Sequence, residues 1–242
     1  MLKDLSTRIA RKGFVGPRYR GLMGKARFAL ESTVARQELF FVNTLESFRA
    51  VEVPEDVGLT LHRIREFADF APFTAGVEAE YYPGYVEAWR APFTWGEQAV
   101  IGTVDGRVAS YNWMQYGMPA GFPTYWGRMF AGEARFIRGG VVPSFRRGGL
   151  NTLMKYRLLE RFFGEEGITR VYAECYKNNL PSVRTLLRLG FRAVALLTVL
   201  EMPPLRGFIR WSSIDRVKAE FLEQGVDLAA APSASTMAEV RP

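Results

Sequence analysis

The feature that most constrains this chain is a strand-like segment that breaks into an arginine- and glycine-rich turn and continues directly into a helical pattern. The segment and its turn read Val141-Val142-Pro143-Ser144-Phe145-Arg146-Arg147-Gly148-Gly149. Apolar residues at helical spacing follow at once, at Leu150, Met154, Leu158 and Phe162. The order of strand, glycine turn and helix predicts an anion-binding site at the turn.

The physical basis of that prediction lies in the first turn of the helix. Its free N–H groups point outward, and the helix dipole adds partial positive charge there. Glycine lets the backbone approach an anion closely, and arginine adds charge. Two common phosphate loops do not fit, because the turn lacks Gly-Lys-Ser/Thr and no Gly-x-Gly-x-x-Gly follows the strand. We expect a phosphate or pyrophosphate here; the alternative is a turn that binds nothing.

Two segments, in order, resemble the signature motifs of the GCN5-related N-acetyltransferases (GNAT superfamily). The first, Val142-x-x-x-Arg146-x-x-Gly149, resembles the Arg/Gln-x-x-Gly-x-Gly/Ala loop that holds the coenzyme A pyrophosphate. The second resembles the version found in ribosomal-protein N-terminal acetyltransferases, and it reads Asn179-x-x-Ser182-Val183-Arg184-x-Leu186-x-Arg188-x-Gly190-Phe191. The resemblance covers roughly Gly58 to Ser212. The chain is also similar to bacterial members of the family whose substrate is uncertain.

This resemblance implies an α/β fold with a central mixed, mostly antiparallel sheet and helices on both faces. Two adjacent parallel strands should splay apart, with the pantetheine arm in the gap. We expect three regions: a basic N-terminal extension and linker (1–57), the acyltransferase domain (58–214), and a C-terminal helix with a disordered tail (215–242). Period-two alternation predicts that Leu59–Ile64 is the first strand of the domain, and Asp105-Gly106 predicts a tight hairpin turn.

The resemblance also implies a set of residues around acetyl-CoA or another acyl-CoA. Main-chain groups of Val141 and Val142 would pair with the pantetheine arm, and Asn179 and Ser182 would lie near it. The residues expected around the pyrophosphate are Arg146, Arg147, Gly148, Gly149, Asn151 and Thr152. Asn151 departs from the family, in which Gly or Ala is usual. Leu186 also departs, because many relatives carry there a tyrosine that protonates the departing thiolate; a thiolate with a pKa near ~8.5 can leave with solvent help.

Acyl transfer to an amine requires a neutral amine, so a general base or a water chain is needed. The candidate bases are Glu133, at the start of the central strand, and Glu174, at the end of the next one. Both are expected where the splayed strands open. The alternative for each is a carboxylate that pairs with a nearby cation, namely Arg135, Arg170 or Lys177. The nucleophile Cys175 is disfavoured, because no histidine partner is evident.

Net charge and composition limit the other functions that this chain could have. The net charge is +7, and much of the excess falls in residues 1–30, where Asp4 is the only acidic residue. This segment fits a solvated extension, an anionic membrane surface, an acidic partner or, on charge alone and least favoured, a nucleic acid. One cysteine excludes an internal disulfide, and one histidine argues against a histidine-rich metal site. No signal-peptide pattern or apolar run of ~20 residues is present, so we expect a cytoplasmic protein, with a peripheral position at a membrane as the alternative.

The sequence therefore favours transfer of acetyl from acetyl-CoA directly to a primary amine of a small molecule, an amino sugar or a peptide, with no metal. A longer-chain acyl transferase at a membrane surface is an alternative, because the loop Gly117–Gly132 is rich in apolar side chains. A non-catalytic CoA-binding module is another, because Leu186 cannot donate a proton. The acceptor is left open, as is the choice between a monomer and a homodimer.

Overall fold

The computed structural model describes residues 35–51, 57–117, 122–124, 127–146, 148–200 and 208–228. Its strands are β1 Ala35–Thr44, β2 Thr60–Ile64, β3 Gln98–Val104, β4 Arg107–Tyr116, β5 Phe122–Thr124, β6 Gly127–Met129, β7 Glu133–Val141, β8 Arg170–Tyr176, β9 Arg192–Leu200 and β10 Phe208–Ser212. Its helices are η2 Phe67–Phe70, α3 Ala71–Glu80, η3 Val86–Trp89, α4 Arg90–Thr94, η4 Pro143–Phe145, α5 Leu150–Gly164, α6 Leu180–Arg188 and α7 Asp215–Glu223.

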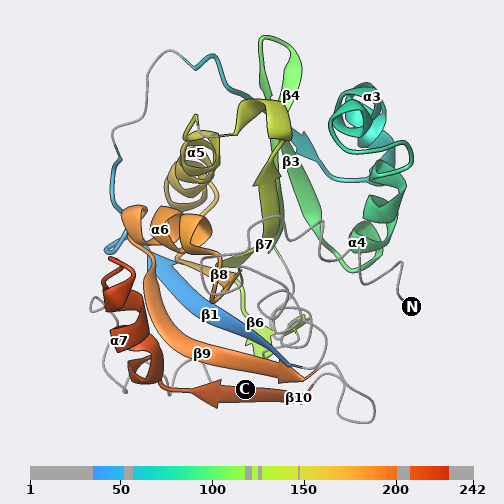
Figure 1. Cartoon of the computed structure of the whole chain (residues 1–242). Helices are drawn as coiled ribbons and strands as arrows, with labels where there is room; N and C mark the ends of the chain where they lie inside the picture. Colours follow the sequence, from blue (N-terminus) through green and yellow to red (C-terminus); the bar gives the residue numbers. More distant parts are fainter. Residues whose placement is uncertain are drawn as a thin grey trace.

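An open mixed sheet of eight strands organises the fold, in the order β10-β9-β1-β8-β7-β4-β3-β2 (Figure 1). The β7–β8 pair is parallel, and the other pairs of this sheet are antiparallel. The expected mixed, mostly antiparallel α/β fold is thus confirmed. The short β5–β6 hairpin stands apart from the sheet, within the stretch that we expected to be one long loop.

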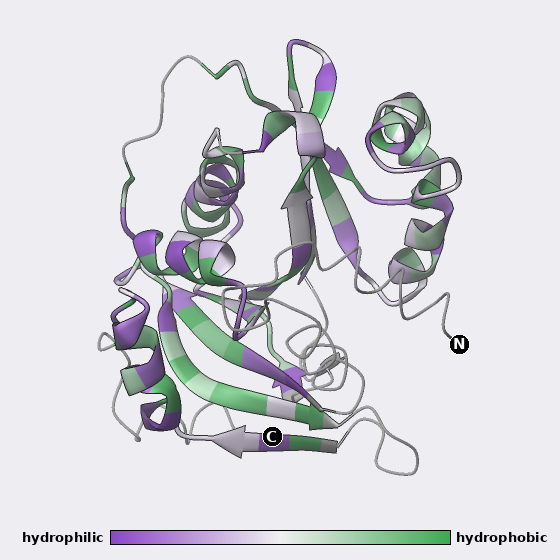
Figure 2. Ribbon diagram, viewed as in Figure 1, coloured by the Kyte–Doolittle hydropathy of each residue, from purple (hydrophilic) through white to green (hydrophobic). Residues whose placement is uncertain are grey.

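Helices cover both faces of the sheet, with α5 and α6 on one side and α3 and α4 on the other (Figure 1). Apolar residues of α5, α6 and α7 pack on the first face, and Figure 2 shows hydrophilic residues interspersed along these helices. On the opposite face, Phe70, Val77 and Trp89 pack against Ile101 and Trp113. Within the described residues, no helix is long and apolar enough to cross a membrane.

β1 corrects the expected domain boundary at residue 58. It lies inside the sheet, where it pairs with β8 along one edge and with β9 along the other. Leu39 and Phe41 join the core beneath α5 and α6, whereas Phe40 joins a cluster on the opposite face. A strand that is covered on both faces needs an apolar residue at every position, and this explains the run Leu39-Phe40-Phe41. Residues 1–34, which carry the basic-extension hypotheses, and the tail 229–242 lie outside the described residues.

The hairpin and the phosphate-loop helix form where local signals place them. Asp105 and Gly106 join β3 to β4 with φ angles of 50° and 72°, as a tight primed turn requires. The strand expected at Leu59–Ile64 is β2, although it is an edge strand and β1 precedes it. Between β2 and β3 the chain forms η2, α3, η3 and α4.

The two parallel strands diverge after a short paired stretch. β7 and β8 pair only where Glu133–Phe136 face Arg170–Ala173. Further along, β7 continues to pair with β4 and β8 continues to pair with β1. The β4–β7 register also shifts between Phe136 and Arg138, a bulge of the kind that bends a strand. The sheet is therefore open between the carboxyl-terminal halves of β7 and β8.

Candidate active site

A cavity of about 1040 Å³ lies where β7 and β8 separate. Its walls come from the diverging strands, from α5 and α6, and from the segment Thr94–Glu97 that leads into β3. Three of the predicted cofactor residues, Asn151, Asn179 and Ser182, line it, although they lie far apart in the sequence. The fold thus brings elements of both motifs to one cleft, which we call the splay cleft.

The predicted anion turn forms the start of α5. Gly149 is the N-cap residue, with φ +73°, and a Cβ placed on it would meet nothing within 4 Å. Backbone conformation, rather than space, therefore requires glycine at this position. The first-turn amides of Leu150 and Asn151 have no partner within the helix. No acidic residue occurs in this first turn, so its positive potential is not offset locally.

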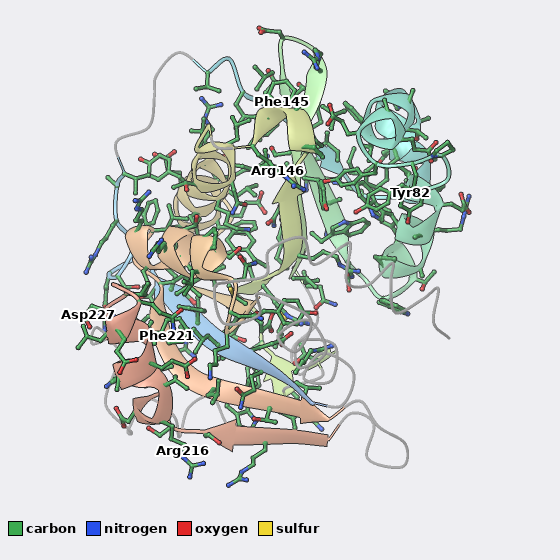
Figure 3. All side chains as sticks on the ribbon, viewed as in Figure 1. Tyr82, Phe145, Arg146, Arg216, Phe221 and Asp227 are labelled. Atoms are coloured by element: carbon green, nitrogen blue, oxygen red, sulfur yellow. The ribbon has the colours of Figure 1, made fainter. Side chains whose placement is uncertain are left out.

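Arg146 stands beside this turn, next to Phe145 (Figure 3). Its Nε donates a hydrogen bond to the main-chain oxygen of Val141, at 3.3 Å. Glu80 of α3 braces the same turn, because the Ser144 amide donates to its Oε2 at 3.1 Å. Gly148 is exposed, with the nearest atom to an added Cβ 3.8 Å away, so this glycine is not sterically required. Arg147 lies outside the described residues.

The main-chain N–H and C=O groups of Val141 and Val142 point toward opposite edges of the strand. The Val142 amide donates to the carbonyl of Ala109 at 2.9 Å, so it is engaged toward β4. Main-chain groups of successive strand residues point to opposite edges, which leaves the Val141 groups on the open edge, where Arg146 reaches its carbonyl. The expectation that both residues pair with a pantetheine arm is therefore corrected for the Val142 amide, which β4 already occupies.

The second motif builds the facing wall of the splay cleft. Asn179 is the N-cap of α6, and its side chain accepts a hydrogen bond from the Ser182 amide at 3.4 Å. Thr152 lies outside the cleft lining, and its hydroxyl is 3.4 Å from that of Thr185, which joins α5 to α6. Leu186 lines the cleft, so the position of the usual family tyrosine does face the predicted site, with a side chain that carries no proton to give.

Glu133 is not where we expected it. It lies at the closed end of the β7–β8 pair and is not part of the cleft lining. Its Oε1 accepts from the Tyr172 hydroxyl at 2.7 Å, and its Oε2 accepts from the Phe130 amide at 2.8 Å. The Arg170 guanidinium is 3.6 Å away. Glu133 is thus a buried structural carboxylate, because strand pairing starts at its residue and opens only four residues later.

Glu174 does lie in the splay cleft, directly after the last residue of β8 that pairs with β7. Its Oε1 is 2.9 Å from the Nε of Arg135, and both side chains are buried. Arg135 also donates to the Gln115 side chain at 3.3 Å. A buried carboxylate held against a guanidinium is stabilised in its ionised form, which suits a structural ion pair.

Sequence reasoning missed a second carboxylate in the cleft, Glu97. It is 7% exposed and pairs with Arg138 of β7. Burial raises the pKa of Glu97, while the charges of Arg138 and Arg135 oppose that rise. A carboxylate shifted in this direction is a better proton acceptor near neutral pH than an ordinary one. Its burial depends on long-range packing, so nothing in the local sequence marks it.

Lys155 of α5 is the second residue that was missed. It lies one turn beyond Asn151, lines the same cleft and is only 9% exposed. Its Nζ donates to Oδ1 of Asn112, and burial lowers its pKa to about 8. The available signal was a lysine next to the apolar stripe of a helix, one turn after a predicted cofactor residue. In the described ranges, no group of three or more histidine, cysteine or acidic side chains could hold a metal ion.

This chain was compared with protein families, curated proteins and solved structures. The model of the acetyltransferase (GNAT) domain matches residues 48–192. A search of curated proteins finds no match. Among solved structures, a GCN5-related N-acetyltransferase from Kribbella flavida is 16% identical and has a TM-score of 0.43, with 69% of this chain and 59% of that chain covered.

Two further structures show the range of these similarities. A GCN5-related N-acetyltransferase from Sphaerobacter thermophilus is 16% identical, with 77% of this chain and 59% of that one covered and a TM-score of 0.45. The ribosomal-protein-S18-alanine N-acetyltransferase from Escherichia coli is also 16% identical, with 57% and 80% covered and a TM-score of 0.42. The chain thus spans 59% of the length of the Kribbella and Sphaerobacter structures.

Proposed function

This chain belongs to the GNAT acetyltransferase family, and from that premise we propose that it transfers acetyl from acetyl-CoA directly to a primary amine. The acceptor is a small molecule, an amino sugar or a peptide. The observation that carries the proposal is the separation of β7 from β8 directly beside the glycine N-cap of α5. This arrangement joins an open strand edge, a cavity and an anion site in one continuous region.

The described residues fit an acyl-CoA. The α5 N-terminus and Arg146 supply positive potential for a pyrophosphate, and the open edge of β7 offers main-chain groups to an amide-containing arm. The cavity of about 1040 Å³ is slightly larger than the upper end of the ~300–1,000 Å³ range of small-molecule sites. Acyl-CoA supplies the activated thioester, and the protein residues position it and manage protons.

We assign the general base to Glu97 rather than to Glu174. Both line the splay cleft, but Glu174 is tied to buried Arg135, whereas Glu97 pairs with Arg138, whose side chain is 43% exposed. Rotation of Arg138 toward solvent would free the Glu97 carboxylate for an incoming ammonium group. The raised pKa of Glu97 also suits removal of a proton from the acceptor. Exposed Trp95, two residues earlier, gives the acceptor an apolar wall.

Free-thiol release from acetyl-CoA in the presence of a panel of primary amines tests the function. We expect Glu97→Gln to lower kcat by roughly 10²–10⁴-fold with the acetyl-CoA affinity unchanged, since the amide keeps the shape but accepts no proton. Glu174→Gln should instead lower stability, because Arg135 loses a buried counter-charge. Glu223→Gln, at an exposed position of α7, is the matched control.

The outcomes separate the competing functions. Thiol release that depends on the amine supports N-acetyl transfer. Release only from longer acyl thioesters would favour the longer-chain acyltransferase. Tight binding of acetyl-CoA without release by any amine would favour a non-catalytic CoA-binding module. Full activity of Glu97→Gln would remove Glu97 from the mechanism without affecting the functional class.

A further inference from the structure

Lys155 is a buried ammonium group without an acidic partner. No ion pair to it occurs in the part of the chain that the structure describes, and its hydrogen bond is made to a neutral amide, Asn112. We propose that the Lys155 ammonium group stabilises the departing CoA thiolate as its counter-charge, a role that rests on the function proposed above. It would stabilise the leaving sulfur in place of the tyrosine that many relatives carry at the position of Leu186.

The position of the ammonium group is the first argument. Its Nζ is 4.6 Å from the ring centroid of Phe136, the last residue of β7 that pairs with β8. The charge therefore lies at the apex of the splay cleft, where the two strands begin to separate. Asn151 lines the same cleft one helical turn nearer to the anion turn. A donor bound at its phosphates by that turn would extend its thioester along α5 toward Lys155.

The sheet is built to receive this side chain. Asn112 of β4 is fully buried and lies over Gly139 of β7, where a Cβ would come within 2.5 Å of its Oδ1. The missing side chain at Gly139 therefore leaves room for the Asn112 carboxamide. The Asn112 Nδ2 donates to the Trp113 carbonyl at 3.1 Å, which turns Oδ1 toward Lys155. A lysine that served only to fill space would not need this arrangement, because methionine or leucine could fill it without burying a charge.

Electrostatics supply the third argument. An amide oxygen and a ring face attract an ammonium group but do not neutralise it. Burial consequently lowers the pKa of Lys155 to about 8, against the ordinary 10.5. The nearby titratable group is the thiol of Cys175 on β8, and burial raises the pKa of that thiol, so it remains protonated. Among the described residues, no carboxylate forms an ion pair with Lys155, so a thiolate formed beside it would supply the counter-charge.

The proposed step balances as follows. The acceptor nitrogen forms a bond to the acyl carbon while the bond from that carbon to sulfur breaks, and the bonding pair stays on sulfur. The Lys155 ammonium group keeps its proton and stabilises the thiolate, and the sulfur takes a proton from solvent after CoA leaves. The proton lost by the acceptor nitrogen goes to Glu97. A pKa of about 8 keeps the Lys155 ammonium group mostly charged at neutral pH, so the positive charge is in place when the thiolate forms.

The test is the acidity of the CoA thiol when it is bound to the full-length protein. Thiolate formation is followed by ultraviolet absorbance across a pH series, as a difference from the complex with desulfo-CoA, which cancels protein tyrosines and Cys175. With wild-type protein, we expect the thiol pKa to fall by about one unit or more, a tenfold change in acidity, because the ammonium stabilises the thiolate. Lys155→Met should abolish that fall, and Lys218→Met, on the surface of α7, should preserve it.

Each outcome has one meaning. A bound thiol with the acidity of free CoA in the wild type, or a fall that survives in Lys155→Met, would overturn the role of Lys155 alone. Failure of CoA to bind the wild type in the same titration would overturn the proposed function, and this role with it. As a supporting kinetic readout, single-turnover acetyl transfer by Lys155→Met should be slower by roughly 10²–10³-fold with acetyl-CoA affinity retained.

Discussion

Replacing Gly190 with alanine is expected to lower the free energy of unfolding by more than about 4 kcal/mol, or to prevent folding. Gly190 has φ +87°, and a Cβ there would overlap the main-chain oxygen of Ser47 and lie 2.8 Å from its carbonyl carbon. The obstacle is backbone, so no side-chain rotation can relieve it. Urea unfolding followed by circular dichroism measures the loss.

Gly225→Ala is the matched control for this prediction. Gly225 has a similar φ of +68°, but an added Cβ would meet nothing within 4 Å. Its substitution should therefore cost only the conformational strain of a left-handed residue, about 1–2 kcal/mol. Equal losses in the two variants would show that the contact between Gly190 and Ser47 does not exist in solution.

The close contact between Gly190 and Ser47 matters because it holds the segment after β1 against the end of the second motif. Two hydrogen bonds converge on the Leu189 carbonyl at the end of α6, from Asn43 Nδ2 at 2.9 Å and from the Arg49 amide at 3.3 Å. The segment that follows β1 is thereby held against the turn between α6 and β9. A large loss in Gly190→Ala would show that residues 35–51 are an integral part of the acyltransferase fold.

The pH dependence of stability should change when Lys155 is replaced by methionine. The pKa of Lys155 is lower in the folded protein, about 8, than the ordinary 10.5 that it regains on unfolding. The unfolded chain therefore binds more protons between these values, and the wild type gains stability as pH rises through that window. Converted at 1.36 kcal/mol per unit, the gain is about 3 kcal/mol, and Lys155→Met should lack it.

Chemical denaturation of both proteins at pH 7 and pH 11 measures this effect. Other groups titrate in the same window, but they do so in both proteins and cancel in the difference between them. From pH 7 to pH 11, we expect the free energy of unfolding of the wild type to rise by about 3 kcal/mol relative to that of Lys155→Met. A difference that stays constant with pH would show that Lys155 keeps an ordinary acidity in the folded protein, and would remove the electrostatic argument for its role.

Features with a local cause could be predicted from the sequence. The Asp105-Gly106 turn, the glycine N-cap at Gly149 and the Asn179 cap of α6 each depend on a few adjacent residues. The divergence of β7 from β8 followed from the resemblance to the family, since no local pattern marks the residue at which two strands stop pairing.

Features with a non-local cause could not be predicted. The apolar run Leu39-Phe40-Phe41 suits a buried strand, but no local pattern shows that β1 inserts between β8 and β9. The predicted position of Glu133 was wrong because it depends on strand register. Register decides whether a residue lies at the closed or the open end of the β7–β8 pair, and it is set by pairing across the sheet. The pKa values of Glu97 and Lys155 are shifted because elements distant in the sequence bury both side chains, and no local sequence pattern indicates that burial.

The most direct test of the central claim is calorimetric titration of the full-length protein with acetyl-CoA. The account predicts one site per chain with micromolar affinity for the wild type. Gly149→Asp should weaken binding by at least about 100-fold, because it places a negative charge at the anion turn in addition to backbone strain at φ +73°. Gly149→Ala, which brings the strain without the charge, should weaken binding far less. No heat of binding from folded wild-type protein, or equal affinity in wild type and Gly149→Asp, would contradict the account.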